Sequence, residues 1–370
     1  MLARRTSLEH PTAGAIELPL LVPAFSSKGF EIRHKGGGKH RKPFSEVAYQ
    51  LEDFGKQPHK AVLLSAYDIH FGHFHAPNLS PTAPLPYLKD VGVAFIDSGG
   101  YELAPEYDST EPRRFSREPE RFSLADYHTV LDSLVKKGPP APLVISNYDH
   151  RREQTSLEQQ VREARATFTR YRDCASDFIV KPWKGRYVDP ADLSDSETAS
   201  LRGFHIIGVT EKELGRDLIE RLKRVALLRQ KLDEQGVGAP IHVWGGLEPL
   251  ASPLFFFAGA QIVDGVSWLR YAYRNGLAIV RDTYCVVSDI GIASPNPMNQ
   301  AYVSLNNLAV LESLTIALQQ WVDLEGKDFS MFSADVRKPL ADAYQVMRAK
   351  IPVLRAVRSD WRPRRRAGSA

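Results

Sequence analysis

Residues 91–103, VGVAFIDSGGYEL, contain the pattern that predicts the fold. The apolar run 91–96 ends abruptly in Asp97, a serine and two glycines, which is typical of a buried β-strand followed by a tight turn. In α/β folds, residues at the carboxyl ends of strands form the ligand-binding edge of the sheet. We therefore expect Asp97 at a functional rim, with Tyr101 placed to cover a flat ligand. The alternative is an aspartate that only caps the following helix.

Similar short apolar segments recur along the chain, and amphipathic helical stretches separate most of them. About eight strands that alternate with helices predict an α/β fold of the (β/α)8 TIM-barrel type, and a doubly wound open sheet is the alternative. The expected strands are residues 61–66, 91–97, 142–148, 178–181, 204–209, 241–245, 261–266 and 277–281. The expected helices between them are residues 124–137, 156–173 and 212–235.

The two ends of the chain follow a different pattern. Residues 15–30 alternate short apolar runs with Pro and Ser, which predicts a hairpin or a capping segment. Residues 301–321 and 334–357 are expected to be helical, with Pro339 and Pro352 interrupting the second segment. We divide the chain into a barrel over residues 1–300 and a helical extension with a basic tail over residues 301–370.

The composition is that of a soluble globular protein, with 43% hydrophobic and 25% charged residues in 370. No secretory segment follows Met1, and no apolar run has the length of a bilayer span, residues 253–263 coming closest. We therefore expect a cytoplasmic protein without a membrane partner. Cys174 and Cys285 are the only cysteines and form no CxxC pair, so a thiolate zinc site of the usual spacing is excluded.

Basic residues are clustered although the net charge is only +4. One cluster surrounds the glycines at 36–38, and the other lies at the C-terminus. Such clusters favour contact with nucleic-acid phosphates, whereas a solvated loop and a disordered tail are the alternative. The two clusters contain Lys35, Lys39, His40, Arg41, Lys42, Arg355, Arg358, Arg362, Arg364, Arg365 and Arg366. Lys39 and Arg41 are our candidate phosphate contacts.

On a barrel, the residues at the strand ends converge on one mouth. Three of those expected here are carboxylates: Asp97, Asp149 and Asp264. One carboxylate can attack an anomeric carbon, a second can transfer protons, and a third can accept paired hydrogen bonds from a base such as guanine. A divalent metal held by the same oxygens is the alternative. His70, His73 and His75 are further candidate metal ligands, although loop histidines more often have no such role.

Several motifs, in order along the chain, resemble those of the tRNA-guanine transglycosylase superfamily. Residues 97–102 (DSGGYE) resemble DSGG(F/Y)Q, and residues 243–246 (VWGG) through 264–266 (DGV) resemble LMGVG…GxDxFDxV. Residues 270–276 (RYAYRNG) are similar to PTRxxRxG. The resemblance covers about residues 20–314. It implies a (β/α)8 pentosyltransferase that exchanges guanine in a polynucleotide for a 7-deazaguanine base.

The resemblance also implies roles for individual residues. Asp264 matches the nucleophile that attacks the ribosyl C1′, Asp97 the general acid/base, and Asp149 the residue that holds the N1 and N2 edge of guanine. Gly208 with Val209 matches the backbone that reaches O6, and Lys181 stands near a glutamine of the family. The further implied substrate-binding residues are Ser65, Ser98, Tyr101, Gly245 and Val266. Arg270 and Arg274 are the implied contacts to nucleic acid.

The chain departs from the family where CxCxxC and a later histidine bind structural zinc, because residues 284–287 (YCVV) keep one cysteine. We therefore expect no zinc site and no cofactor. The divergent motifs and the lost ligands favour the branch that inserts 7-deazaguanines such as preQ0 into DNA, over a tRNA enzyme. Candidate protein partners are a second copy of the chain and other proteins of a DNA-modification system. A non-catalytic nucleic-acid-binding subunit and a metal-dependent barrel hydrolase are the alternatives from other classes.

Overall fold

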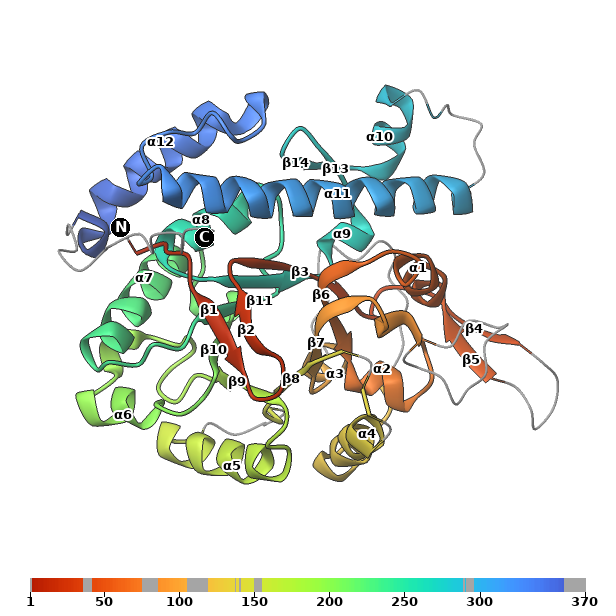
Figure 1. The fold of residues 1–370 in the computed structure, drawn as a ribbon, viewed down its shortest axis with the longest axis horizontal. Helices are drawn as coiled ribbons and strands as arrows, with labels where there is room; N and C mark the ends of the chain where they lie inside the picture. The colour runs from red at the N-terminus through yellow and green to blue at the C-terminus, as the bar shows by residue number, and fades with distance from the viewer. Residues whose placement is uncertain are drawn as a thin grey trace, which may run out of the picture.

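The structure is a computed structural model that describes residues 2–35, 42–74, 86–104, 119–136, 138–139, 141–149, 155–288, 290 and 296–355. Eight parallel strands form a closed barrel in the spatial order β10-β11-β12-β3-β6-β7-β8-β9. Helices surround the barrel, and further helices from the C-terminal part lie on one side of it (Figure 1). The predicted (β/α)8 barrel with added C-terminal helices is confirmed.

The barrel strands are short runs of mostly apolar residues, most of them buried on both faces, as a wall between an inner core and outer helices requires. The order around the barrel follows the order along the chain, and β12 closes the barrel against β3, where Asp264 pairs with Val22. The strands are β3 (Leu20–Phe25), β6 (His59–Ser65), β7 (Val91–Asp97), β8 (Leu143–Ser146), β9 (Ala175–Val180), β10 (Ile206–Thr210), β11 (Ile241–Trp244) and β12 (Ile262–Gly265).

Two strand predictions were wrong. Residues 15–30 were expected to form a hairpin or cap, but β3 (Leu20–Phe25) is a barrel strand with all its residues buried. Pro23 within this run argues against a central strand on sequence grounds, because proline cannot donate to a ladder. Residues 277–281 were expected in the barrel, but β14 (Leu277–Ile279) pairs antiparallel with β13 (Ala272–Arg274) outside it. A short apolar run describes either location equally well.

Two further hairpins and several helices lie outside the barrel strands. The helices predicted over 124–137 and 156–173 are present as α4 (Leu124–Lys136) and α5 (Leu157–Arg170). Helix α7 (Leu218–Glu234) begins later than predicted, because residues 211–214 form a 3₁₀ turn and Asp217 caps the helix. The hairpin strands are β1 (Ser7–His10) and β2 (Gly14–Glu17), and a second hairpin is formed by β4 (Ile32–Lys35) and β5 (Lys42–Ser45). The outer helices are α1 (Val47–Phe54), α2 (Ala66–His70), α3 (Gly100–Leu103), α4 (Leu124–Lys136), α5 (Leu157–Arg170), α6 (Asp195–Ser200), α7 (Leu218–Glu234) and α8 (Ala251–Ala258). Short 3₁₀ turns are η2 (Pro86–Leu88), η3 (Pro190–Asp192) and η4 (Glu211–Leu214).

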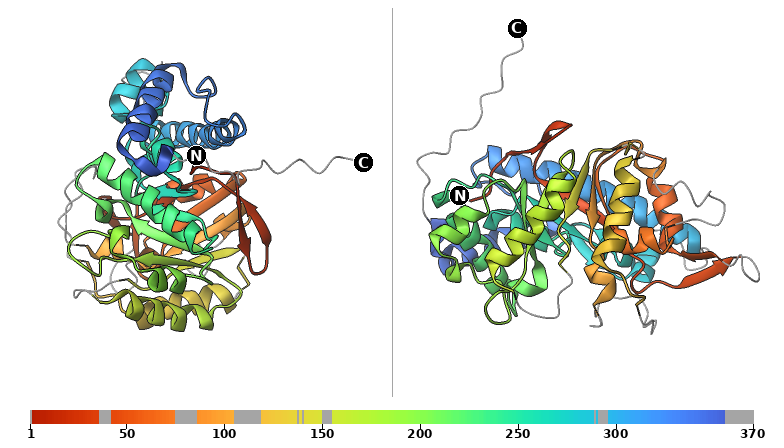
Figure 2. Two further views of the ribbon diagram at one scale, coloured as in Figure 1. Left: turned by 90° about the vertical axis from the view of Figure 1, so that its left-hand side faces the viewer. Right: turned by 90° about the horizontal axis from the view of Figure 1, so that it is seen from below.

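The C-terminal helices form a layer along one side of the barrel (Figure 2). Helix α11 (Asn296–Asp323) contacts α1, β3, the short helix α9 (Ser267–Arg270) and β13, and α10 (Arg281–Val287) packs on the same hairpin. Helix α12 (Ala334–Lys350) packs on α7 and α8, and the turn η5 (Pro352–Arg355) follows it. The predicted interruption at Pro339 was wrong, since α12 continues through it. The burial of Leu340 and Tyr344 on the same helix offsets the one backbone hydrogen bond that proline removes.

One apolar stretch was missed in the sequence. Residues Asn299–Asp323 of α11 are long and apolar enough to cross a membrane by length and composition. A helix that packs on a protein core meets the same criterion, and α11 buries Leu311, Leu318 and Trp321. The stretch is therefore weak evidence for a membrane span.

Candidate active site

The carboxyl ends of the barrel strands bring the three predicted aspartates together. Asp97 is the last residue of β7, Asp264 lies in β12, and Asp149 follows β8. Burial raises the pKa of Asp97 well above its ordinary value, and the negative charges of Glu102, Asp149 and Asp264 raise it further. These carboxylates therefore act on one another across a single mouth.

The Asp264 carboxylate is held through one of its two oxygens. The backbone N–H of Gly245 donates to Oδ1 at 2.9 Å, and Nε2 of His242 lies 3.2 Å from the same oxygen as an ion pair. Among the described residues, no contact reaches Oδ2. The left-handed backbone of Gly245, with φ +83°, lets the chain turn so that its N–H meets the carboxylate. Oδ2 is thus the oxygen left for chemistry.

His242 connects Asp264 to a second buried carboxylate. Its Nδ1 lies 2.6 Å from Oδ2 of Asp177, and both side chains are fully buried. Desolvation alone would lower the pKa of His242, but the attraction of Asp177 and Asp264 outweighs it and raises the pKa to about 9. His242 is therefore a cation at neutral pH. The sequence reading missed both residues, although a charged side chain in an apolar strand (ASDFIV and IHVW) is the signal that could have found them.

Gly208 lies in the middle of β10 rather than at the mouth. It pairs with Ile179 on one side and His242 on the other, so its N–H lies in the plane of the sheet. A Cβ there would come within 2.6 Å of Trp244 Nε1 and 2.7 Å of Asp177 Oδ1. The absence of a side chain makes room for these two groups, and Val209 beside it is fully buried. The structure therefore does not bring this backbone N–H to the mouth.

The turn after β7 is shaped around Asp97. Its carboxylate accepts hydrogen bonds from the backbone N–H groups of Ser98 at 2.7 Å and Gly99 at 3.3 Å. Gly99 has φ +88°, and a Cβ there would lie 2.6 Å from Cβ of Tyr67. Only glycine satisfies both the left-handed backbone and this close approach. The DSGG sequence therefore fixes the position of the aspartate.

Glu102 is a further buried acid that the sequence reading did not assign a role. Its Oε2 accepts a hydrogen bond from Ser65 Oγ at 2.8 Å, and its Oε1 accepts one from Ser26. Burial raises the pKa of Glu102 to about 7, with a further contribution from Asp68, and the two serine hydroxyls only partly oppose this. Ser65, predicted as a substrate contact, is bonded to Glu102 and pairs with Asp97 across β6 and β7.

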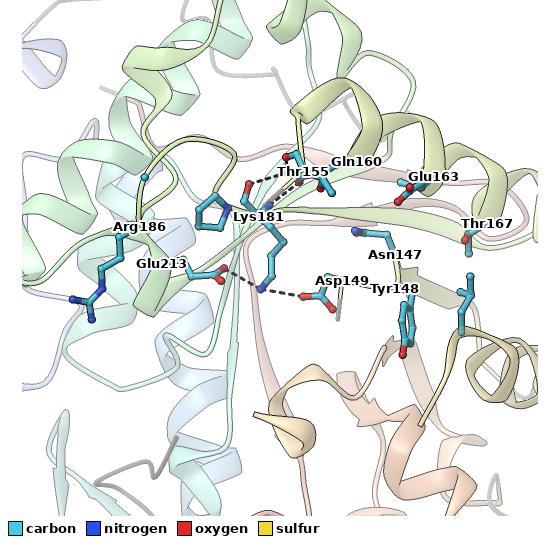
Figure 3. A pocket seen from close by; sticks show the side chains of 14 residues that line it. Asn147, Tyr148, Asp149, Thr155, Gln160, Glu163, Thr167, Lys181, Arg186 and Glu213 are labelled. Carbon is cyan, nitrogen blue, oxygen red and sulfur yellow. Dashed lines mark hydrogen bonds and ion pairs between the residues drawn. The ribbon is translucent and has the colours of Figure 1, made fainter. Parts of the chain in front are cut away.

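Asp149 forms a network with Lys181 after the ends of β8 and β9, next to the turn that follows β7 (Figure 3). Ser98 Oγ donates to Asp149 at 2.6 Å, and Lys181 Nζ lies 3.1 Å from Asp149 and 3.0 Å from Glu213. Burial would lower the pKa of Lys181, but the attraction of the two carboxylates outweighs it and raises the pKa. A cavity of about 480 Å³ opens beside this network, and Arg186 also lines it.

Arg270 is used to hold Tyr101. Its guanidinium donates to Tyr101 Oη at 2.8 Å and to the carbonyl of Lys28 at 3.1 Å, and the side chain is buried. Lys28 Nζ lies 4.6 Å from the centre of the Tyr101 ring and donates to its carbonyl at 2.9 Å. The two cations thus fix an aromatic ring directly after the DSGG turn. Val266, the predicted partner of Tyr101, follows Asp264 by two residues and is half-buried.

The other predicted nucleic-acid contacts lie apart from this site or outside the description. Arg274 is half-buried on the β13 hairpin, and Arg355 donates to the carbonyl of Arg348. Lys39 and Arg41 lie outside the described residues, as do the arginines of the tail after residue 355.

Ser27, Asp68 and His73 form a buried cluster near the mouth, but not a nucleophilic triad. His73 Nδ1 lies 2.7 Å from Asp68 and 3.3 Å from Ser27 Oγ. A catalytic histidine contacts its serine and its aspartate through different ring nitrogens. Here both contacts fall on one nitrogen, and Asp68 also accepts from the N–H of Ser27 at 2.7 Å, so the cluster ties β3 to α2.

Metal-ligand candidates were also considered. Within the described ranges, no group of three or more His, Cys, Asp or Glu side chains is arranged to hold a metal ion. Cys174 and Cys285 are free and buried. His70 packs against Phe122, with 5.3 Å between ring centres, and His75 lies outside the described residues.

Comparison of the chain with models of known protein families gives no match, and comparison with curated proteins gives none either. The chemistry of the site therefore has to be argued from its geometry. The mouth contains an aspartate beside a cation, a second acid whose pKa is raised, and a carboxylate–lysine pair beside a cavity. Such a set can form a covalent intermediate, move a proton and bind a base.

Proposed function

We propose that the chain is a nucleobase transglycosylase that exchanges guanine in a polynucleotide for a 7-deazaguanine such as preQ0. The observation that carries the proposal is the contrast between two aspartates at one mouth. Asp264 lies beside the cation of His242 and the N–H of Gly245, whereas Asp97 lies among carboxylates that raise its pKa. Opposite environments of this kind separate a nucleophile from a proton donor.

In the first step, Asp264 Oδ2 attacks C1′ of the target nucleotide, and the bond from C1′ to guanine N9 breaks. Asp97 gives its proton to the departing base. In the second step, the incoming base transfers its N9 proton to Asp97 and attacks C1′, and the bond from C1′ to Oδ2 breaks. Two inversions retain the configuration, as in retaining glycosidases.

Asp149 and Lys181 bind the base. Asp149 accepts from the N1–H and the exocyclic amine of guanine, and the ammonium of Lys181, 3.1 Å from Asp149, donates to O6. Tyr101, fixed by Arg270, covers one face of the ring, and Val266 covers the other. This assignment places Lys181 where the related enzymes have a glutamine.

DNA is the favoured polymer. The chain lacks the CxCxxC ligands of the tRNA enzymes, and its basic segments suit any phosphate backbone. The target nucleotide has to leave its stack to reach the mouth, which partner proteins or a second copy of the chain can assist in a duplex. The proposal requires no cofactor.

The test is a base-exchange assay with labelled guanine, supplied separately with undermodified tRNA and duplex DNA. We expect label to enter DNA, and Asp264→Asn to lower the rate on the order of 10⁴-fold or more, because the amide cannot serve as the nucleophile. Asp195→Asn on α6, an exposed aspartate, is the matched control and should retain the wild-type rate. Intact-mass measurement of the quenched reaction should detect a nucleotide adduct in the wild type and in Asp195→Asn, but not in Asp264→Asn.

The outcomes separate the alternatives. Incorporation into tRNA alone would keep the chemistry and identify a tRNA enzyme. Tight binding of both polymers without exchange or adduct would favour a non-catalytic binding subunit. Hydrolysis that a chelator abolishes would favour the metal-dependent hydrolase.

A further inference from the structure

We propose that His242, held by Asp177, positions Asp264 for attack and carries the positive charge that balances its carboxylate when that carboxylate leaves C1′. This inference rests on the proposed function and adds residues that the sequence motifs do not contain. His242 does not reach the substrate in this scheme. It acts through Asp264 and is therefore a positioning residue.

The geometry links the three side chains across the barrel interior. Asp177 lies on β9, His242 on β11 and Asp264 on β12. Because β10 lies between β9 and β11, the contact of Asp177 with His242 crosses β10. This contact crosses β10 at Gly208, which has no side chain. A Cβ at Gly208 would lie 2.7 Å from Asp177 Oδ1. His242 then spans 2.6 Å to Asp177 through Nδ1 and 3.2 Å to Asp264 through Nε2.

The orientation of Asp264 follows from this arrangement. The N–H of Gly245 donates to Oδ1, and His242 Nε2 lies 3.2 Å from the same oxygen as an ion pair without hydrogen-bond geometry. Within the described part of the chain, Oδ2 has no hydrogen bond or ion pair. The His242 ring is itself clamped, since it stacks on Trp244 with ring centres 4.4 Å apart and meets the edge of Phe95 at 5.5 Å. A nucleophile fixed in this way does not have to be reoriented during the reaction.

The net charge of Asp177, His242 and Asp264 changes during the proposed reaction. The titratable groups that face His242 are Asp177 from β9 and Asp264 from β12, while Phe95 and Trp244 fill the rest of its surroundings. When the sugar esterifies Asp264, the remaining Asp177–His242 pair is neutral. When the bond from C1′ to Oδ2 breaks, the negative charge returns to Asp264 beside a cation already in place. A preformed charge in a buried site stabilises such a developing ion strongly.

The experiment compares His242→Gln and Asp177→Asn with His205→Gln, a control in which a half-buried histidine is removed near the amino ends of β9 and β10. We expect His242→Gln to lower kcat about 10- to 100-fold, the scale on which loss of an outer-shell partner acts in other sites, with KM nearly unchanged. Asp177→Asn should fold more readily than His242→Gln, because asparagine keeps the volume of the aspartate side chain.

The pH profile separates positioning from a purely structural role. The pKa of His242 is raised from 6.5 to about 9, so the ring keeps its charge at neutral pH and loses it as the pH rises through about 9. Asp177→Asn removes one of the two charges that raise this pKa, so the alkaline limb of kcat should move to lower pH. Equal kcat values and pH profiles for His242→Gln and His205→Gln would overturn the inference.

A second readout does not depend on exchange. In ¹⁵N-histidine NMR spectra, both ring nitrogens of His242 should carry protons at about pH 7, and Asp264→Asn should lower the pH at which one is lost. A neutral His242 ring in the wild type overturns the inference even if exchange is observed. A wild type that exchanges guanine in neither polymer overturns the proposed function, and the catalytic role of His242 with it, whatever the ring carries.

Discussion

At the barrel mouth, the β9–β12 side buries the Asp264 carboxylate against a histidine cation, whereas the β6–β7 side places the half-buried Asp97 near further carboxylates. Asp97 ends β7 and Asp264 is the residue before the end of β12, so both lie at the same rim. Their electrostatic surroundings differ because β11 supplies His242 to one side, while α3 supplies Glu102 to the other. In the proposed mechanism, this difference in surroundings separates the nucleophile from the acid.

Among the variants below, we expect the largest effect from removing the acid Asp97. Asp97→Asn should lower the exchange rate about 10²- to 10⁴-fold, because the departing base then lacks a proton donor. Burial and the neighbouring carboxylates raise the pKa of Asp97, so the wild-type rate should fall as the pH rises through that raised value. In a profile of rate against pH, the Asp97→Asn variant should not show this fall.

The matched control for this variant lies at the other end of the same strand. Asp90→Asn replaces an exposed aspartate just before β7 and should keep both the rate and the pH profile of the wild type. If Asp97→Asn retained the wild-type profile, the proton donor would have to be a different group.

A smaller change tests the source of the raised pKa. Glu102→Gln removes a negative charge that acts on Asp97, so the pH limb assigned to Asp97 should move to lower pH. The pKa of Glu102 is itself raised from 4.5 to about 7, so its contribution to folding is complete below pH 4.5 and is lost as the pH rises through about 7. This difference corresponds to about 3 kcal/mol, which the variant should not lose.

Denaturant unfolding at low and high pH measures this second effect. Glu158→Gln, at an 87% exposed side chain on α5, is the control and should follow the wild type at both pH values. A Glu102→Gln protein that loses as much stability as the wild type between the two pH values would contradict the role assigned to the buried carboxyl.

The smallest expected effect is on the β9–β12 side. Gly208→Ala places a Cβ 2.6 Å from Trp244 Nε1 and 2.7 Å from Asp177 Oδ1, and such overpacking costs about 1–3 kcal/mol. We expect lower stability together with a lower kcat, because Asp177 is displaced from His242. Gly238→Ala meets no atom within 4 Å and should leave both quantities unchanged. A lower stability with an unchanged kcat would separate Asp177 from catalysis.

Several parts of the site could be predicted because they depend on consecutive residues. Strand β7 (Val91–Asp97) was predicted with its observed ends, since the apolar run and the DSGG turn define it locally. The meeting of Asp97, Asp149 and Asp264 at one mouth followed from their positions after parallel strands. The place of β3 was not predicted, because a short apolar run with a proline does not indicate which strands it pairs with.

The sequence by itself determined the barrel and the three aspartates at its rim, through the period of its apolar residues and the glycines of its turns. Only the tertiary structure decided how those aspartates differ. Asp177 is separated from His242 by 65 residues along the chain, yet closure of the barrel brings them to 2.6 Å. Electrostatic environment depends on distances in space within a buried interior, and those distances are set by strands that are far apart in sequence.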